Sequence, residues 1–130
     1  MKLTINVDIY STKVIFVTTF DELKKLHKDA DKNQVFVTIN YTSHIYVYVN
    51  NEFDSMLDYR YIQCLSHEMN HAAMCILGNV GVRFGFNNQE PLCYLQDFLI
   101  SKVYKEIVKH ENNLHESGKT KDAEKTLPKL

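Results

Sequence analysis

The run His67-Glu68-Met69-Asn70-His71 constrains this chain more than any other stretch of it. On a helix, side chains four residues apart lie one turn above each other, so both imidazoles can reach a single metal ion. Glu68 then points about 100° around the helix from His67, where its carboxylate can hold a water molecule without binding the metal. The alternative is that two histidines merely lie on a helix surface, because a pattern this short also arises by chance.

The sequence around this run predicts a helix that extends beyond it on both sides. Ser55, with Asp58 three residues later, is a suitable N-cap, and Gly78 is expected to take the left-handed position at the C-terminal end. Apolar residues follow at helical spacing at Leu57, Tyr61, Leu65, Met69, Ala72 and Leu77. The two histidines are therefore expected in the middle of a helix, where a rigid metal site belongs.

The residues before this helix predict four strands and one short helix. The strands are expected at Lys2–Tyr10, Val14–Val17, Gln34–Asn40 and His44–Val49, and the first two are expected to form a hairpin. In His44–Val49 the Ile and Val side should face the core and the Tyr side should face out. Thr19 and Glu22 form a capping box, which predicts a helix that ends near Asp31.

A last long helix is expected to begin near Asn88, with Pro91 in its first turn, where a missing N–H is tolerated. Its inward residues are expected to be Leu92, Leu95, Phe98, Leu99, Val103 and Ile107. Apolar residues become sparse from Lys109 onward. We therefore expect one domain over residues 1–110 and a charged, flexible C-terminal tail over residues 111–130.

These elements predict an α+β fold, with a small mixed or antiparallel sheet packed on the motif helix and on the C-terminal helix. The chain has 130 residues and a net charge of -1, and it has no cluster of Lys and Arg, so nucleic acid is not an expected partner. No stretch approaches the roughly 18 apolar residues of a membrane span, and the alternating N-terminus is unlike a signal peptide. Three cysteines, an odd number, favour a reducing compartment, and we expect a cytoplasmic protein.

Two histidines alone do not complete a catalytic zinc site, which usually takes three protein ligands and leaves the fourth position to water. The extended pattern with glycine and histidine at positions 74 and 77 is excluded, because Met74 and Leu77 stand there. His110 and His115 lie too far along the last helix. Glu90, at the start of that helix, is the best candidate for the third ligand, although a glutamate there also favours the positive end of the helix dipole.

The cysteines are expected to be structural. Cys64 and Cys75 share a helix face with the two histidines, but four ligands on one face would be spread over about three turns and cannot surround one ion. Cys64 and Cys75 are therefore interpreted as small buried hydrophobic residues. Cys93, one turn from Glu90, has an approach to the metal as its alternative role, but core packing is the expected one.

The sequence resembles a known group of enzymes. The chain is similar to small metallopeptidases encoded by phages and prophages in three segments. These are the short alternating N-terminus, the segment His67-Glu68-Met69-Asn70-His71-Ala72 and the segment Asn88-Gln89-Glu90-Pro91-Leu92-Cys93-Tyr94-Leu95. More widely, a His-Glu-x-x-His helix followed by a glutamate on the next helix is similar to the thermolysin-like gluzincins. One departure is Tyr94, which stands where the thermolysin-like enzymes have an aspartate that orients a ligand histidine. Asp97, one turn further along, is the alternative residue for that role.

The resemblance implies a minimal zincin-like domain that binds Zn²⁺ through His67, His71 and Glu90. It implies a peptidase in which Glu68 is the general base and a metal-activated water attacks a peptide bond of a peptide or protein substrate. It also implies that an exposed strand beside the motif helix pairs with the substrate, and His44–Val49 is the expected strand. Tyr94, Tyr46 and His44 are the candidates for stabilising the oxyanion.

A second class of function stays open at this point. The chain can also be a catalytically silent, zinc-stabilised binding module of phage origin that acts on a protein partner. Its small size favours this class, because few loops are left to build a specificity cleft. Glu68 favours the peptidase, because a purely structural site has no use for a general base, and the peptidase is the preferred interpretation.

Overall fold

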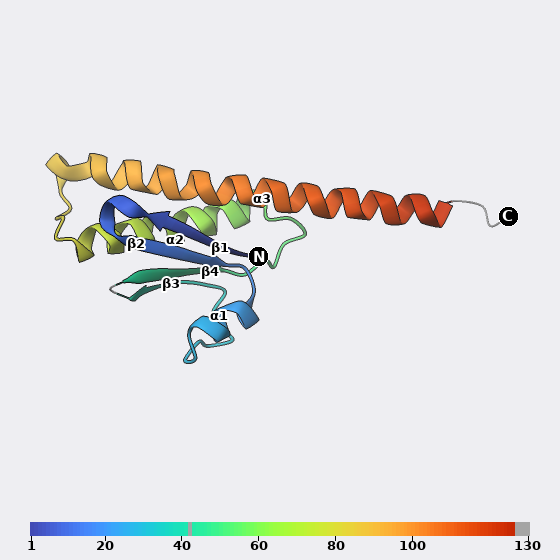
Figure 1. The fold of residues 1–130 in the computed structure, drawn as a ribbon, viewed down its shortest axis with the longest axis horizontal. Coiled ribbons are helices and arrows are strands. Elements are labelled where there is room, and N and C mark those ends of the chain that lie inside the picture. The colour runs from blue at the N-terminus through green and yellow to red at the C-terminus, as the bar shows by residue number, and fades with distance from the viewer. Residues whose placement is uncertain (42, 127–130) are drawn as a thin grey trace.

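The computed structural model describes residues 1–41 and 43–126, without the side chains of residues 119–126. In this part of the chain the fold is α+β, with a small mixed sheet and three α-helices. The four strands lie in the order β1-β2-β4-β3. Figure 1 shows two long helices on one face of this sheet and a short helix on the other. The expected fold class, α+β with a small mixed sheet, is confirmed.

Strands β1 (Lys2–Val7) and β2 (Thr12–Val17) form the expected antiparallel hairpin. The first strand ends at Val7, earlier than predicted, because Asp8–Tyr10 forms a 3-10 turn. Ser11 closes this turn in the left-handed region, with φ of 50°, and its N–H donates to the carbonyl of Asp8 at 3.0 Å. A serine in this region is uncommon but tolerated at a single turn position.

Strand β4 (His44–Val49) lies inside the sheet, parallel to β2 and antiparallel to β3 (Phe36–Tyr41). The chain reaches β3 from β2 through α1 (Phe20–Leu26), which begins with the predicted capping box of Thr19 and Glu22. Helix α1 ends at Leu26 and not near Asp31. The free edges of the sheet are thus β1 and β3.

The prediction that the tyrosine side of His44–Val49 faces out is wrong for Tyr48, which is only 1% exposed. Tyr48 packs under α1 in a small second core with Ile15, Val17, Leu23 and Ala30. The sheet therefore has apolar side chains on both faces at this strand, and the simple alternation of a strand with one exposed face does not apply.

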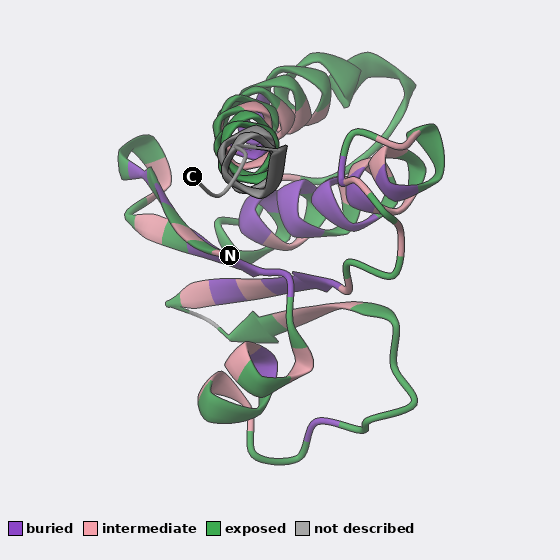
Figure 2. Cartoon of the chain, turned by 90° about the vertical axis from the view of Figure 1, so that its right-hand side faces the viewer, coloured by how far each residue is buried: buried purple, intermediate pink, exposed green. Residues whose placement is uncertain are grey.

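Helix α2 (Tyr59–Asn79) carries the histidines and packs on the other face of the sheet, where the main core lies. Figure 2 shows the buried side of α2 directed toward the sheet and α3. The Tyr61 hydroxyl donates to the carbonyl of Val49 at 2.9 Å, which joins α2 to β4, and burial raises the pKa of Tyr61. This packing fixes how α2 is rotated over the strands.

The predicted ends of α2 are corrected in two places. Asp58, and not Ser55, is the N-cap, and its side chain accepts from the N–H of Arg60. Ser55 instead accepts from the N–H of Leu57, one turn earlier. Gly78 lies within the helix, and Gly81, with φ of +83°, takes the left-handed conformation after it.

Helix α3 runs over Gln89–Thr126, beginning where the sequence predicts, after a 3-10 turn at Phe86–Asn88. Leu95, Leu99, Val103 and Ile107 are buried at successive turns, whereas Phe98 is 39% exposed. Helical backbone continues past Lys109, where apolar residues become sparse, and runs to Thr126 through most of the segment expected to be a tail. Figure 1 shows this end of α3 projecting beyond the rest of the fold, and residues 127–130 lie outside the described part.

Candidate metal centre

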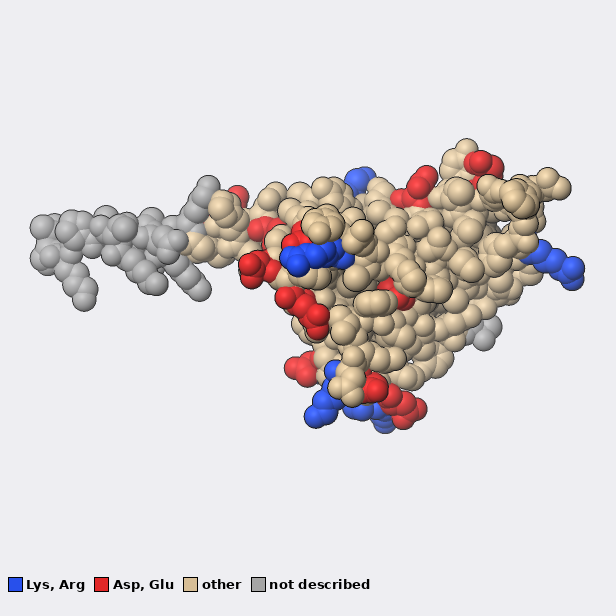
Figure 3. Space-filling view, turned by 180° about the vertical axis from the view of Figure 1, so that it is seen from behind, with Lys and Arg blue, Asp and Glu red and all other residues tan. Residues whose placement is uncertain are grey.

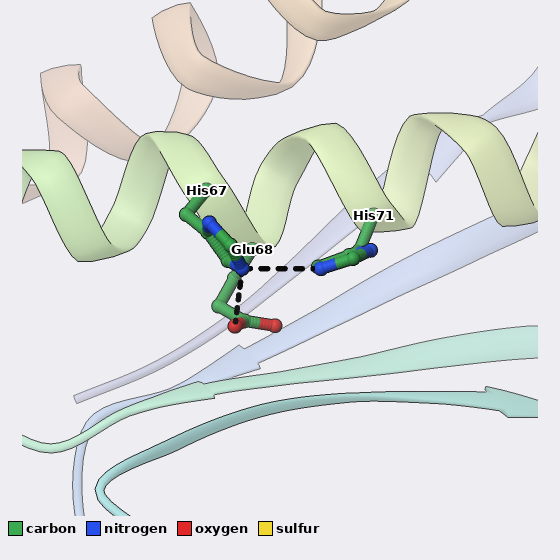
Figure 4. A group of neighbouring side chains, drawn as sticks. All are labelled: His67, Glu68 and His71. Atoms are coloured by element: carbon green, nitrogen blue, oxygen red, sulfur yellow. Dashed lines mark hydrogen bonds and ion pairs between the residues drawn. The ribbon is translucent and has the colours of Figure 1, made fainter.

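His67, Glu68 and His71 come together on the middle of α2, as Figure 4 shows. The Nε2 atoms of the two histidines lie 3.1 Å apart. Two imidazole nitrogens bound to one tetrahedral zinc ion lie about 3.3 Å apart, given Zn–N bonds of about 2.0–2.1 Å. The pair therefore has the spacing of two ligands of one ion, and the same distance also fits a hydrogen bond between the two rings.

Glu68 is the buried member of the group, and only 4% of its side chain is exposed. Its Oε1 lies 4.0 Å from Nε2 of His67, and its Oε2 accepts a hydrogen bond from the hydroxyl of Thr38 on β3. The Thr38 hydroxyl also lies 3.1 Å from the backbone carbonyl of Glu68. One carboxylate oxygen is thus held by the sheet, while the other faces His67.

The histidines are accessible from two shallow pockets. One has a volume of about 280 Å³ and lies toward β3, with Phe36, Thr38, Glu68, His71 and Cys75 in its lining. The Phe36 ring meets the His67 ring edge-on, with centroids 6.0 Å apart. The side chain of His67 is 60% exposed, so an ion or a ligand can reach the imidazoles without any rearrangement.

The second pocket, of about 330 Å³, lies toward α3 and contains Gln96 beside His67, Asn70 and His71. Asn70 donates to the side-chain oxygen of Gln96 at 3.3 Å, and Gln96 donates to the carbonyl of Ser66 at 3.4 Å. Neither Gln96 nor Thr38 is predicted from the sequence to lie near the histidines. The available signal for Gln96 was a polar residue between Leu95 and Leu99 on the inward side of the last helix.

The structure does not bring Glu90 into the group of His67, Glu68 and His71, whose ligand atoms lie within 4.8 Å of one another. Glu90 lines a different pocket, together with Tyr94 and the turn after β1. Gln96 occupies the part of α3 that lies beside the histidines. The role of Glu90 as a zinc ligand therefore stays a prediction from the resemblance.

The other residues expected near the metal also lie elsewhere. Tyr94 lines the pocket of Glu90 and is 70% exposed. His44 and Tyr46 alternate with the core residues of β4, so they lie on the opposite face of the sheet from α2. There Nε2 of His44 lies 3.1 Å from the hydroxyl of Tyr46. None of these three is placed to stabilise an oxyanion at the histidines.

The strand expected to pair with an extended substrate is also corrected. Strand β4 is hydrogen-bonded on both sides, to β2 and to β3, and has no free edge. Strand β3 is the edge strand next to the histidines. It is fixed to α2 by Thr38 at Glu68 and by paired side-chain amides of Asn40 and Asn79, at 2.9 and 3.2 Å.

Two of the three cysteine predictions agree with the structure. Cys64 and Cys75 are partly buried and pack against the main core, and burial raises the pKa of the Cys75 thiol. Cys93 is exposed, so the prediction of core packing is wrong there. On α3, the neighbouring residue Leu92 is the one that packs, partly buried, against the main core.

Comparison with protein-family models, with curated proteins and with solved structures gives no match for this chain. No helix in its described part is long and apolar enough to cross a membrane. On the face in Figure 3, Lys and Arg side chains stand apart or among Asp and Glu side chains. The fold and the site together define an α+β chain with a His-Glu-His group on its central helix.

Proposed function

We propose that this chain is a zinc-dependent peptidase with a minimal zincin-like arrangement. The observation that carries the proposal is the 3.1 Å separation of the two imidazole nitrogens beside a carboxylate that faces them. His67 and His71 have the donor chemistry that zinc prefers, and Glu68 is a suitable general base. A zinc ion bound there would lower the pKa of a water molecule and polarise a substrate carbonyl.

The residues of the chain have separate roles in this proposal. Glu68 takes a proton from the attacking water through the oxygen that faces His67, and it returns the proton to the leaving amine. Thr38 holds the other oxygen of Glu68 and so orients the carboxylate. The free edge of β3, beside Phe36, offers backbone groups with which an extended peptide can pair.

Glu90 completes the proposed ligand set only if the first turn of α3 moves toward His71. Its side chain has no ion pair among the described residues, so no salt bridge opposes such a movement. If α3 does not move, two histidines and solvent hold the ion. Such a site is expected to bind zinc more weakly than one with three protein ligands.

The burial of Glu68 favours a second candidate, a zinc-stabilised module that binds a protein partner without hydrolysis. A carboxylate that is 4% exposed and bonded to Thr38 can serve to fasten α2 to β3, which is a structural role. In that case the metal and Glu68 stabilise the fold, and no general base is required.

The variant Glu68→Gln separates the two functions, because glutamine keeps the size of the side chain but cannot take up a proton. If the chain is a peptidase, cleavage of a broad peptide library by the zinc-loaded protein should fall by roughly a hundredfold or more. Zinc content, measured by mass spectrometry, and the melting temperature should stay close to those of the wild type. His67→Ala is the control that should lose the metal.

If zinc-loaded wild-type protein cuts no member of the library, the peptidase is contradicted and the binding module is the better description. If the wild type cuts peptides but Glu68→Gln loses its zinc or its fold together with the activity, the general-base role is contradicted, because Glu68 then acts as a ligand or as a structural carboxylate.

A further inference from the structure

A continuous groove follows the free edge of β1, at the opposite side of the sheet from β3 and the histidines. Its two parts have volumes of about 690 and 400 Å³, and they share Asn6, Asp8 and Phe98 in their linings. One wall is the chain from Leu3 to Tyr10, and the other is a face of α3 that repeats every four residues. That face consists of Glu90, Tyr94, Phe98, Lys102 and Glu106.

The β1 wall offers unpaired backbone groups. The N–H of Thr18 donates to the carbonyl of Met1 at 3.0 Å, and hydrogen-bonded pairs alternate along an antiparallel ladder. With this register, Lys2, Thr4 and Asn6 direct their backbone N–H and C=O groups away from β2. In the described sheet β1 pairs with β2 alone, so this edge can accept a further strand.

The larger part of the groove is mainly apolar, and the smaller part is lined mostly by polar residues. Ile9, 83% exposed, and Tyr94, 70% exposed, lie together in the larger part, and an exposed apolar patch is typical of an interaction site. Asp8 and Glu90 line this same part, and neither takes part in an ion pair within the described residues. Farther along, Lys102 lies over the Phe98 ring and Glu106 pairs with Lys109.

We propose that this groove binds an extended segment of a protein partner as an added strand beside β1. The segment carries a large apolar side chain that packs against Tyr94 and Phe98, and a Lys or Arg that meets Asp8 and Glu90. The free edge selects an extended backbone, the apolar wall selects the side chain, and the two carboxylates select the positive charge. This binding site is separate from the histidines and shares only Glu90 with the ligand set proposed for zinc. It rests on the arrangement of the described residues, in which Glu90 lines the groove and not the metal centre.

The probe is the fluorescein-labelled peptide Thr-Val-Thr-Phe-Thr-Lys-Thr, together with its reversed sequence, since a strand can add in either direction. In an extended peptide Val, Phe and Lys lie on one face, which is the face that would meet α3. Matched peptides replace Lys by Gln or Phe by Thr. Binding is measured by fluorescence anisotropy on the full chain, and the site is located by amide chemical shifts over residues 2–10.

Two sets of variants test the groove. Thr4→Pro removes one outward N–H while leaving the bonds to β2 in place, and it should abolish binding. The double variant Asp8→Asn with Glu90→Gln should weaken the Lys peptide about two- to fivefold and leave the Gln peptide unchanged. Asp97→Asn, an exposed carboxylate on the same helix outside the groove, is the matched control and should have no effect.

The proposal is overturned if neither direction of the Lys peptide saturates the wild-type chain, or if folded Thr4→Pro binds as tightly as the wild type. It is also overturned if the wild type sediments as a dimer that Thr4→Pro converts to a monomer, because a second copy then occupies the edge. If circular dichroism shows that Thr4→Pro is unfolded, the charge variants decide the question. Equal weakening of the Lys and Gln peptides by those variants would contradict the proposal.

Discussion

The Glu68 carboxylate is buried, with 4% of its side chain exposed, and it lies 4.0 Å from the exposed imidazole of His67. An ionised carboxylate away from water is costly unless hydrogen bonds compensate for the lost hydration. The Thr38 hydroxyl provides such a bond from β3, and no buried side-chain oxygen or nitrogen lacks a partner among the described residues. Thr38 is therefore important for the stability of α2 against the sheet.

Replacing Thr38 by valine keeps the shape of the side chain but removes this donor. We expect Thr38→Val to reduce the free energy of unfolding by about 1–3 kcal/mol, the usual effect of leaving a buried polar group without its partner. Thr38→Ser retains the hydroxyl and should recover most of the loss. Urea titrations of the three proteins measure the difference, and equal stability of Thr38→Val and the wild type would contradict the structural role.

Glu90 gives a second prediction for a single residue. As the described residues are arranged, Glu90→Ala should change the zinc affinity by less than about tenfold. Removal of a residue that supports a metal ligand usually costs about tenfold or more, and Glu90 does not contact His67 or His71 in this arrangement. Competition with a chelating dye measures this affinity, with Glu106→Ala, a carboxylate farther along the same helix that pairs with Lys109, as the control. A much larger loss would show that the first turn of α3 moves on binding and that the resemblance identified the third ligand correctly.

Among the elements, α2 depends on the way it begins. Asp58 caps the helix through the N–H of Arg60, and both of its carboxylate oxygens contact the Arg60 guanidinium, at 3.0 and 2.9 Å. The side-chain hydrogen bond from Arg60 is the main reason why the pKa of Asp58 is lowered from 3.8 to about 2. Because the folded pKa lies below the unfolded one, the stabilisation is complete above the unfolded value and is lost as the pH falls through the folded value.

We therefore expect the melting temperature of the wild type to fall more steeply between about pH 4 and pH 2 than that of Asp58→Asn. Asparagine also caps helices well, so this variant should remain folded at neutral pH, whereas Asp58→Ala should melt at a lower temperature there. Circular dichroism across this pH range measures the effect. Asp29→Asn, an exposed carboxylate elsewhere, should follow the wild type, and parallel curves for all proteins would contradict the prediction.

The elements with local signals could be predicted from the sequence. Four features follow from residues that lie close together in the chain. They are the Thr19 capping box, the strand His44–Val49, the mid-helix position of the histidines and the start of α3. The position of β4 inside the sheet could not be predicted, since parallel pairing with β2 depends on contacts between distant segments. The same reason explains why Thr38 and Gln96, which lie on other elements, were not predicted near the histidines.

At the scale of the whole molecule, α3 consists of two parts with different contacts. Up to Ile107 it contributes one buried residue per turn, and Glu111 then accepts a hydrogen bond from the N–H of Met56 at 2.9 Å. From residue 112 to residue 118 every residue is exposed, including Leu114, which is the one large apolar residue among them. A mostly polar segment of this kind is typical of a helix that does not pack on its own domain.

Two truncations test where the folded unit ends. The chain that ends at Asn112 keeps all these contacts, so it should bind zinc and melt within a few degrees of the full chain. The chain that ends at Glu106 loses Ile107, which is fully buried, and the Glu111 bond, and it should be less stable by roughly 2–5 kcal/mol. Thermal melts and zinc titrations compare the three proteins. If the chain ending at Asn112 lost its fold or its zinc, the projecting part of α3 would be required by the domain itself, and the boundary predicted near residue 110 would be wrong.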